Sequence, residues 1–477
     1  MSRHFITSLF LMILLNVVIK PVWVFGIDRQ VQVVVGAEVY GKYFSLFSLS
    51  LIFNILLDLG ITNFANRNIA QQADQLPTLC SNGLIAKLIL SFAYTIILFF
   101  IATSSGITDF KLLFLLIALQ VLTSFLIFAR GIVSALQLFK TDAILSIIDK
   151  GLMIVIAGLW LYTPLIGKLF TVDDFAWLQV LTVGFTLLIS IAVLLRRKVF
   201  QQFTADVASV FKIVVQSLPF ALTVFFMGLH NRTDAFLLER IHTNGAYEAG
   251  VYAAAYRLLD AANMLGYLFA TLLVSYWSKH INDREGTQKS LSFSHQLLIP
   301  AGLLLAVVAL FLDKELYQLL YHHESAYAEE ILKWCLITII PYFITHIYGT
   351  MLTASGNIKT LMWLVIIASA INLAFNSIAI PAWGATACVI AGMISQGILA
   401  VLTIILVKRK TGYSINTQVW VKYLIIILVL SLSLFFIDKT TISIYAKLGI
   451  IIAEWFIVMN LLRIFSIRSF LNLMSEK

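Results

Sequence analysis

The stretch FFMGLHNRTDAFLL, residues 225–238, carries charged side chains inside a strongly apolar segment. Arg232 stays protonated in any protein environment and presents a fork of donors that fits phosphate oxygens. Placing an arginine at the centre of a bilayer costs about 2.5–3.5 kcal/mol, and an aspartate costs a similar amount. Asp234 is two residues further on, roughly 200° around a helix, so the two cannot pair directly. We therefore interpret Arg232 as a binding residue for an anionic, phosphorylated substrate.

Three other basic residues within apolar segments are candidates, namely Lys20, Lys150 and Arg257. Ionisable residues inside a membrane usually face the interior of a helix bundle or a water-filled cavity. With Arg232 they predict a cationic lumen that binds the substrate. For Lys20 the alternative is a side chain that reaches outward to the membrane surface.

Acidic residues also fall within these segments: Asp58, Asp149, Asp234, Asp260 and Glu454. Asp149 and Lys150 are adjacent and point about 100° apart on a helix, so we expect each to need a partner on another helix. Arg257 and Asp260 share a helix face, which fits either a structural ion pair or a site. Asp58 is near the inner end of its segment, where helix capping or a pair with Arg67 is expected.

The segments that carry these residues are typical of membrane helices. The chain has 477 residues, of which 60% are hydrophobic and 12% are charged, whereas soluble proteins carry about 25% charged residues. The apolar runs are continuous and about 20 residues long, which indicates helices that cross a bilayer. We expect about fourteen spans, at residues 5–27, 41–61, 79–102, 111–130, 143–163, 176–195, 210–238, 246–275, 291–312, 331–353, 358–380, 384–407, 418–437 and 442–464.

Lys and Arg gather in alternate loops, including those that hold Arg130 and the run 196–198, which predicts that both termini face the cytoplasm.

Net charge and motifs exclude several classes of protein. The net charge of +9 is scattered over short loops, so we expect no nucleic-acid partner. The three cysteines form neither a disulfide framework nor a metal-binding spacing. Walker A, HExxH and GxSxG motifs are missing, so we expect no catalytic residues, no metal and no cofactor.

An internal repeat divides the chain. GAEVYGKYF (36–44) resembles GAYEAGVYA (245–253), and PLIG (164–167) resembles PAWG (381–384) at a similar offset. The two matches favour a duplicated six-helix unit, a design found in transporters with a site between the halves. We expect an N-lobe at 1–200 with helices 1–6 and a C-lobe at 201–412 with helices 7–12. Residues 413–477 are expected to form helices 13–14 and a cytoplasmic tail.

Three stretches carry a resemblance to a known family: 33–71, with its Tyr-Gly and Asp-Leu-Gly elements, 231–260, and 354–395. In these stretches the chain resembles the polysaccharide flippases of the multidrug/oligosaccharidyl-lipid/polysaccharide exporter superfamily. The resemblance implies an all-α integral membrane protein with two six-helix lobes, related by pseudo-two-fold symmetry around a central cavity, plus two C-terminal helices. It implies a bacterial cytoplasmic (inner) membrane protein whose substrate is an undecaprenyl-diphosphate-linked oligosaccharide.

The expected function is transfer of such polysaccharide repeat units, of O-antigen or capsule type, from the cytoplasmic to the outer leaflet by alternating access. Lys20, Lys150, Arg232 and Arg257 would hold the diphosphate. Asp149, Asp234 and Asp260 are candidates for coupling to H⁺ or Na⁺.

Three alternatives remain. A lipid II flippase shares the anionic substrate, and a multidrug–cation antiporter fits poorly with the basic excess. A membrane-embedded polymerase or ligase fits poorly with the short outer loops.

Overall fold

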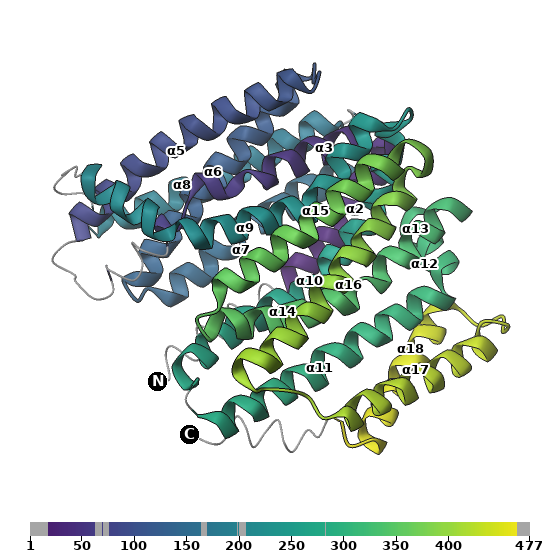
Figure 1. Ribbon diagram of the computed structural model, residues 1–477. Coiled ribbons are helices and arrows are strands. Elements are labelled where there is room, and N and C mark those ends of the chain that lie inside the picture. Colours follow the sequence, from purple (N-terminus) through teal and green to yellow (C-terminus); the bar gives the residue numbers. More distant parts are fainter. Residues whose placement is uncertain are drawn as a thin grey trace. The chain divides into compact units, whose positions relative to one another are not determined.

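The computed structural model of the chain consists of helices and their connections wherever it is described (Figure 1). The description covers residues 18–62, 69, 76–163, 169–197, 199, 207–281 and 283–464, and it covers their side chains except at 207–220 and 275. None of these residues forms a strand, so the expected all-α structure is confirmed. Two features of the sequence analysis lie outside the described residues: the stretch PLIG (164–167), which was matched with PAWG (381–384), and Arg67.

The chain divides into two compact units, residues 1–250 and 251–477. The helices of the first are η1 (Val22–Asp28, a π-helix), α2 (Arg29–Val35), α3 (Ala37–Ile52), η2 (Asn54–Leu57, a 3₁₀-helix), α5 (Leu76–Ser104), α6 (Phe110–Ala135), α7 (Phe139–Tyr162), α8 (Val172–Arg196) and α9 (Val207–Ile241). Helix α10 (Gly245–His280) begins in the first unit and continues into the second. The rest of the second unit consists of α11 (Arg284–Phe311), α12 (Asp313–Tyr321), α13 (Ala326–Ile337), α14 (Ile339–Ala354), α15 (Ile358–Trp383), α16 (Ala385–Thr411), α17 (Thr417–Ile437) and α18 (Ile444–Leu461).

Within the described residues, 11 helical segments are long and apolar enough to cross a membrane. They correspond to α5, α6, α7, α8, α10, α11, the pair α13–α14, α15, α16, α17 and α18. The predicted first, second and seventh spans are not among them. The first begins before residue 18, and the second is interrupted between Ile52 and Ile61. The seventh corresponds to α9, a helix of 35 residues.

The first unit is held together by helix pairs with apolar faces. Helix α6 packs along α8, α7 packs against α8 and η1, and α3 packs against α9. A core cluster that includes Cys80, Phe128, Leu145 and Leu194 joins α5, α6, α7 and α8. On the other side of α5, Phe92 and Phe100 are exposed, as expected for side chains that face lipid.

The second unit is organised around α11 and α16. Helices α14 and α15 pack against α16, and α13 and α14 pack against α11. Helices α17 and α18 lie beside α11 (Figure 1). They are attached by a 2.8 Å hydrogen bond between His295 Nδ1 and the Tyr423 hydroxyl. In a second attachment, Trp455 Nε1 donates to the carbonyl of Pro300 at 3.0 Å.

Candidate functional site

Three basic side chains from separate helical segments gather in the first unit. Lys20 lies just before η1, Arg130 lies in the last two turns of α6, and Lys150 lies in α7. The Lys20 ammonium experiences the charges of Lys150, Arg130 and Asp149. Trp23 of η1 lies under Lys150, with Nζ 4.9 Å from the ring centroid, which is within cation–π range. The chain therefore concentrates positive charge where η1, α6 and α7 meet.

Two carboxylates neutralise part of this charge. Arg130 Nε lies 2.8 Å from Asp142 Oδ1, and Lys150 Nζ lies 3.4 Å from Asp149 Oδ2. Lys20 forms no salt bridge with any residue of the described ranges. We call Lys20, Arg130, Lys150, Asp142 and Asp149 the cationic cluster. With three positive and two negative groups it has a surplus of positive charge and favours an anionic ligand.

The contact between Asp149 and Lys150 corrects one expectation. The two were expected to point too far apart to pair, but they form a salt bridge. The 100° separation applies to the Cα–Cβ bonds, whereas the lysine stem has four methylene groups and can bend back to a neighbouring carboxylate.

The side chains of the cationic cluster are exposed enough to contact a ligand and buried enough that salt screens their charges only in part. The Arg130 and Lys150 side chains are 24% and 33% exposed. Partly buried charges are screened by salt less than surface charges are. A guanidinium binds two oxygens of one phosphate, and an ammonium adds a compact charge beside it. The geometry therefore suits a phosphate or diphosphate group.

Arg130 was missed as a site residue because it was counted among the inner-loop residues. Helix α6 continues to Ala135, past the predicted end of its span at 130. Asp142, its partner, lies in the first turn of the next helix. A basic residue at the end of one span and an acidic residue at the start of the next were the available signal.

The other predicted positions lie in helices α9 and α10. Arg232 and Asp234 lie in α9, where Arg232 is half-buried and Asp234 is 3% exposed. Arg257 and Asp260 lie in α10, in the second unit, and both are half-buried. The structure thus brings Lys20, Lys150 and Asp149 together. The roles of the four residues in α9 and α10 stay predictions.

The two copies of the GAxxxG-like repeat contact each other in the first unit. A Cβ added at Gly41 would lie 1.9 Å from the carbonyl oxygen of Ala246, and one added at Gly250 would lie 1.9 Å from that of Ala37. Gln32 Nε2 also donates to the Gly250 carbonyl at 2.9 Å. The contact is reciprocal, because each glycine packs on the alanine of the other copy. Small residues four apart let two helices approach at backbone distance. We call Ala37, Gly41, Ala246 and Gly250 the glycine seam.

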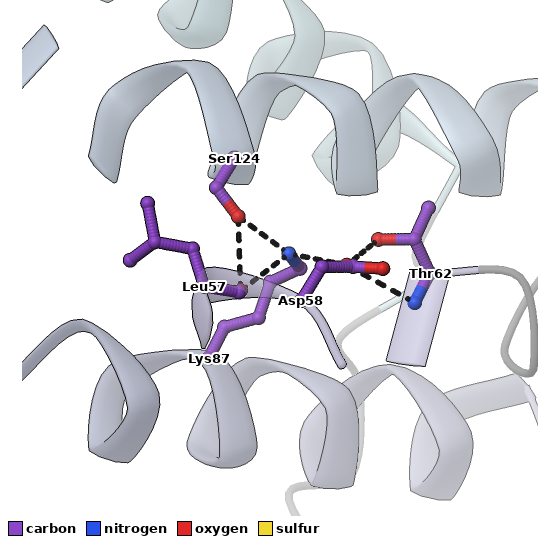
Figure 2. Close-up of polar contacts among 5 residues, drawn as sticks. All are labelled: Leu57, Asp58, Thr62, Lys87 and Ser124. Carbon is purple, nitrogen blue, oxygen red and sulfur yellow. Dashed lines mark hydrogen bonds and ion pairs between the residues drawn. The ribbon is translucent and has the colours of Figure 1, made fainter. Parts of the chain in front are cut away.

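A buried lysine lies at the interruption of the second span (Figure 2). Lys87 of α5 is 1% exposed, and its Nζ lies 2.7 Å from Asp58 Oδ1. The same nitrogen donates to the Ser124 hydroxyl of α6 at 2.7 Å and to the Leu57 carbonyl at 3.1 Å. We call Lys87, Asp58, Leu57 and Ser124 the Lys87 pocket.

Sequence reasoning missed Lys87, although the residue lies within the predicted span 79–102. Asp58 was expected to cap a helix or to pair with Arg67. It accepts hydrogen bonds from the amide and hydroxyl of Thr62, and among the described residues, which do not include Arg67, its ion-pair partner is Lys87. The two are 29 positions apart in sequence, so local spacing could not connect them.

The model of the family described as "Polysaccharide biosynthesis protein" matches residues 6–279, more than half of the chain. The chain belongs to the polysaccharide biosynthesis protein family. The match covers the cationic cluster, the glycine seam and the Lys87 pocket. A second model, MatE, matches residues 219–378. No curated protein matches the chain in sequence.

Solved structures show that this family member shares the fold of the multidrug/oligosaccharidyl-lipid/polysaccharide exporter superfamily. "Lipid II flippase MurJ, inward closed conformation" is 14% identical, with a TM-score of 0.70 over 97% of this chain and 98% of that one. An inward-facing multidrug resistance MATE family transporter is 16% identical, with a TM-score of 0.58 over 84% of this chain and 94% of that one. These likenesses and the 11 candidate spans confirm the expected fold class, that of a multi-pass membrane protein.

Proposed function

We propose that the protein is a flippase that moves undecaprenyl-diphosphate-linked polysaccharide repeat units from the cytoplasmic to the outer leaflet by alternating access. The observation that carries this proposal is the cationic cluster, a surplus of positive charge within membrane helices. Membership of a polysaccharide biosynthesis family supports the sugar part of the substrate. The protein would lie in a bacterial cytoplasmic membrane with both termini in the cytoplasm.

The cationic cluster suggests how the headgroup is received. The diphosphate would contact Lys20 first, because this ammonium has no salt bridge among the residues described. Its oxygens would then compete with Asp149 for Lys150 and with Asp142 for Arg130. A ligand shifts a conformational equilibrium only through different affinities for the two states. Closure of the protein around the diphosphate would supply that difference.

Arg232 and Arg257 are the further substrate-binding positions in this proposal. Asp149, Asp234 and Asp260 are the candidates for coupling to H⁺ or Na⁺. Asp149 contacts Lys150, one of the proposed substrate-binding residues, directly.

Two other functions make different predictions. A lipid II flippase also carries a diphosphate headgroup, and a lipid II flippase shares the fold over 97% of this chain. Its loss would accumulate peptidoglycan precursors. A polymerase or ligase would act after transfer, so its loss would leave single repeat units on the cell surface.

A strain that lacks the gene tests the proposal, and an Arg232→Ala variant tests whether this position contacts the substrate. A strain that lacks the gene is complemented with wild type or variant at matched membrane levels, with Lys42→Gln as a control, because Lys42 is an exposed residue paired with Glu38 one helical turn away. We expect loss of surface polymer and accumulation of lipid-linked single units at the cytoplasmic face. Loss of one charge-assisted contact should reduce transfer about 10- to 150-fold. Wild-type levels of surface polymer would show that Arg232 has a structural role and does not contact substrate.

A further inference from the structure

The predicted second span, residues 41–61, is interrupted near its C-terminal end. Helix α3 ends at Ile52, a short 3₁₀ segment follows, and Leu59 and Gly60 take positive φ values of 42° and 85°. A positive φ at leucine is unusual, because its Cβ crowds the backbone there. Backbone groups freed by such a break need partners, since lipid offers none.

The Lys87 pocket supplies those partners. The carbonyl of Leu57, at the end of the 3₁₀ segment, accepts from Lys87 Nζ and from the Ser124 hydroxyl, the latter at 3.0 Å. Further back, the Ser50 carbonyl accepts from the Tyr94 hydroxyl at 2.8 Å. Helices α5 and α6 therefore contribute side chains that stabilise the break.

Three oxygens of different kinds converge on one nitrogen (Figure 2). Nζ of Lys87 meets a carboxylate oxygen of Asp58, the carbonyl oxygen of Leu57 and the hydroxyl oxygen of Ser124, at 2.7, 3.1 and 2.7 Å. An ammonium has three donors, and each has one acceptor here. Thr62 donates its amide and hydroxyl to the same Asp58 oxygen, which fixes the carboxylate.

This oxygen set is one that also suits a small metal cation. Unwound backbone carbonyls and the C-terminal ends of broken helices coordinate Na⁺ in membrane transporters, and the helix dipole adds negative potential there. The Asp58 side chain is 28% exposed, whereas Lys87 is enclosed. The carboxylate side of the pocket is therefore open to the surroundings of the protein.

We propose that the Lys87 pocket is a monovalent-cation site whose cation is the chain's own ammonium group. The ammonium satisfies the carboxylate and the freed carbonyl, so the break in the second span needs no ion from solution. Removing the Lys87 side chain would open a polar cavity that Na⁺ enters through the exposed side of Asp58. This inference is independent of the transported substrate.

The test compares the thermal unfolding of the purified full chain in NaCl and in choline chloride at equal ionic strength. Choline is too large for the pocket. Four proteins are needed: wild type, Lys87→Ala, Lys87→Met and the double variant Lys87→Ala/Asp58→Asn. Met fills the space of the lysine stem without charge, and the double variant removes the anionic ligand.

We expect the midpoint temperature of thermal unfolding of the wild type to be the same in both salts. Lys87→Ala should unfold at lower temperature in choline and recover by about 3 °C or more in NaCl, with a saturable dependence on Na⁺. Lys87→Met and the double variant should show no such recovery. Equal midpoints for Lys87→Ala in the two salts would overturn the proposal and leave a simple structural ion pair. A sodium response that persists in the double variant would also overturn it.

The proposal can be tested even if Lys87→Ala is too unstable to purify. Its level in membranes is then measured by immunoblot from cells grown at low and high sodium. A higher level at high sodium, not shared by Lys87→Met, supports the proposal. Absence of the variant at both sodium concentrations overturns it, because a refilled site should restore folding.

Discussion

Replacing Gly41 or Gly250 with alanine is expected to reduce transport about 5- to 150-fold, because the glycine seam cannot then close. A new Cβ would lie 1.9 Å from a backbone oxygen at either position, a distance that no real Cβ adopts. The obstacle is backbone, which cannot rotate away as a side chain can. Overpacking of this kind costs about 1–3 kcal/mol.

We expect the seam to matter for transport because of where it lies. With both termini in the cytoplasm, as predicted, the loops before the second and eighth spans lie outside, and each copy of the repeat begins in or beside one of them. The contact should therefore seal the outer side in one state of the transport cycle. Alanine would disfavour that state and leave the second state in excess. Surface polymer in complemented cells measures the loss, and thermal unfolding measures how much of it is general destabilisation.

Gly392→Ala is the matched control for the seam. This glycine also lies within a helix, α16, but a Cβ there would meet nothing within 4 Å. Alanine favours helix over glycine by about 1 kcal/mol, so Gly392→Ala should be neutral or slightly stabilising. Normal transport by both seam variants would show that close backbone contact is not required in the cycle.

Neutralising Lys20 and Lys150 together is expected to reduce transfer of lipid-linked units at least about 100-fold, because each charge-assisted phosphate contact contributes about 1.5–3 kcal/mol. The variants are Lys20→Gln, Lys150→Gln and their combination, assayed at matched membrane levels. Single variants should each lose about tenfold or more. A binding measurement with a short-chain polyprenyl diphosphate should show the same order of losses.

Loss of Lys150 also leaves Asp149 without the lysine that pairs with it in the structure. The double variant Lys150→Gln/Asp149→Asn separates the two effects, because it removes both charges of that pair. We expect it to regain thermal stability but not transport. Recovery of transport along with stability would show that Lys150 only neutralises Asp149, and the diphosphate site would then need other residues.

Much of the fold followed from apolar patterning. Continuous apolar runs predicted most of the helices from α5 to α18 close to their observed positions. The reason is that a single chain segment can cross lipid only as a helix. The repeat at 36–44 and 245–253 marked residues that meet in space, since small residues at matching spacing allow close packing.

The sequence by itself determined the helical membrane class, the duplicated small-residue motif and the presence of basic side chains within spans. Only the tertiary structure decided which charges meet. Lys87 of α5 forms a salt bridge with Asp58, which lies where the predicted second span is interrupted. Arg130 near the end of α6 forms one with Asp142 at the start of α7. The rotamer of Lys150 brings it to Asp149. Long charged side chains form ion pairs where the two groups are close in space and shielded from water. Neither the distance nor the shielding can be read from the spacing of residues along the sequence.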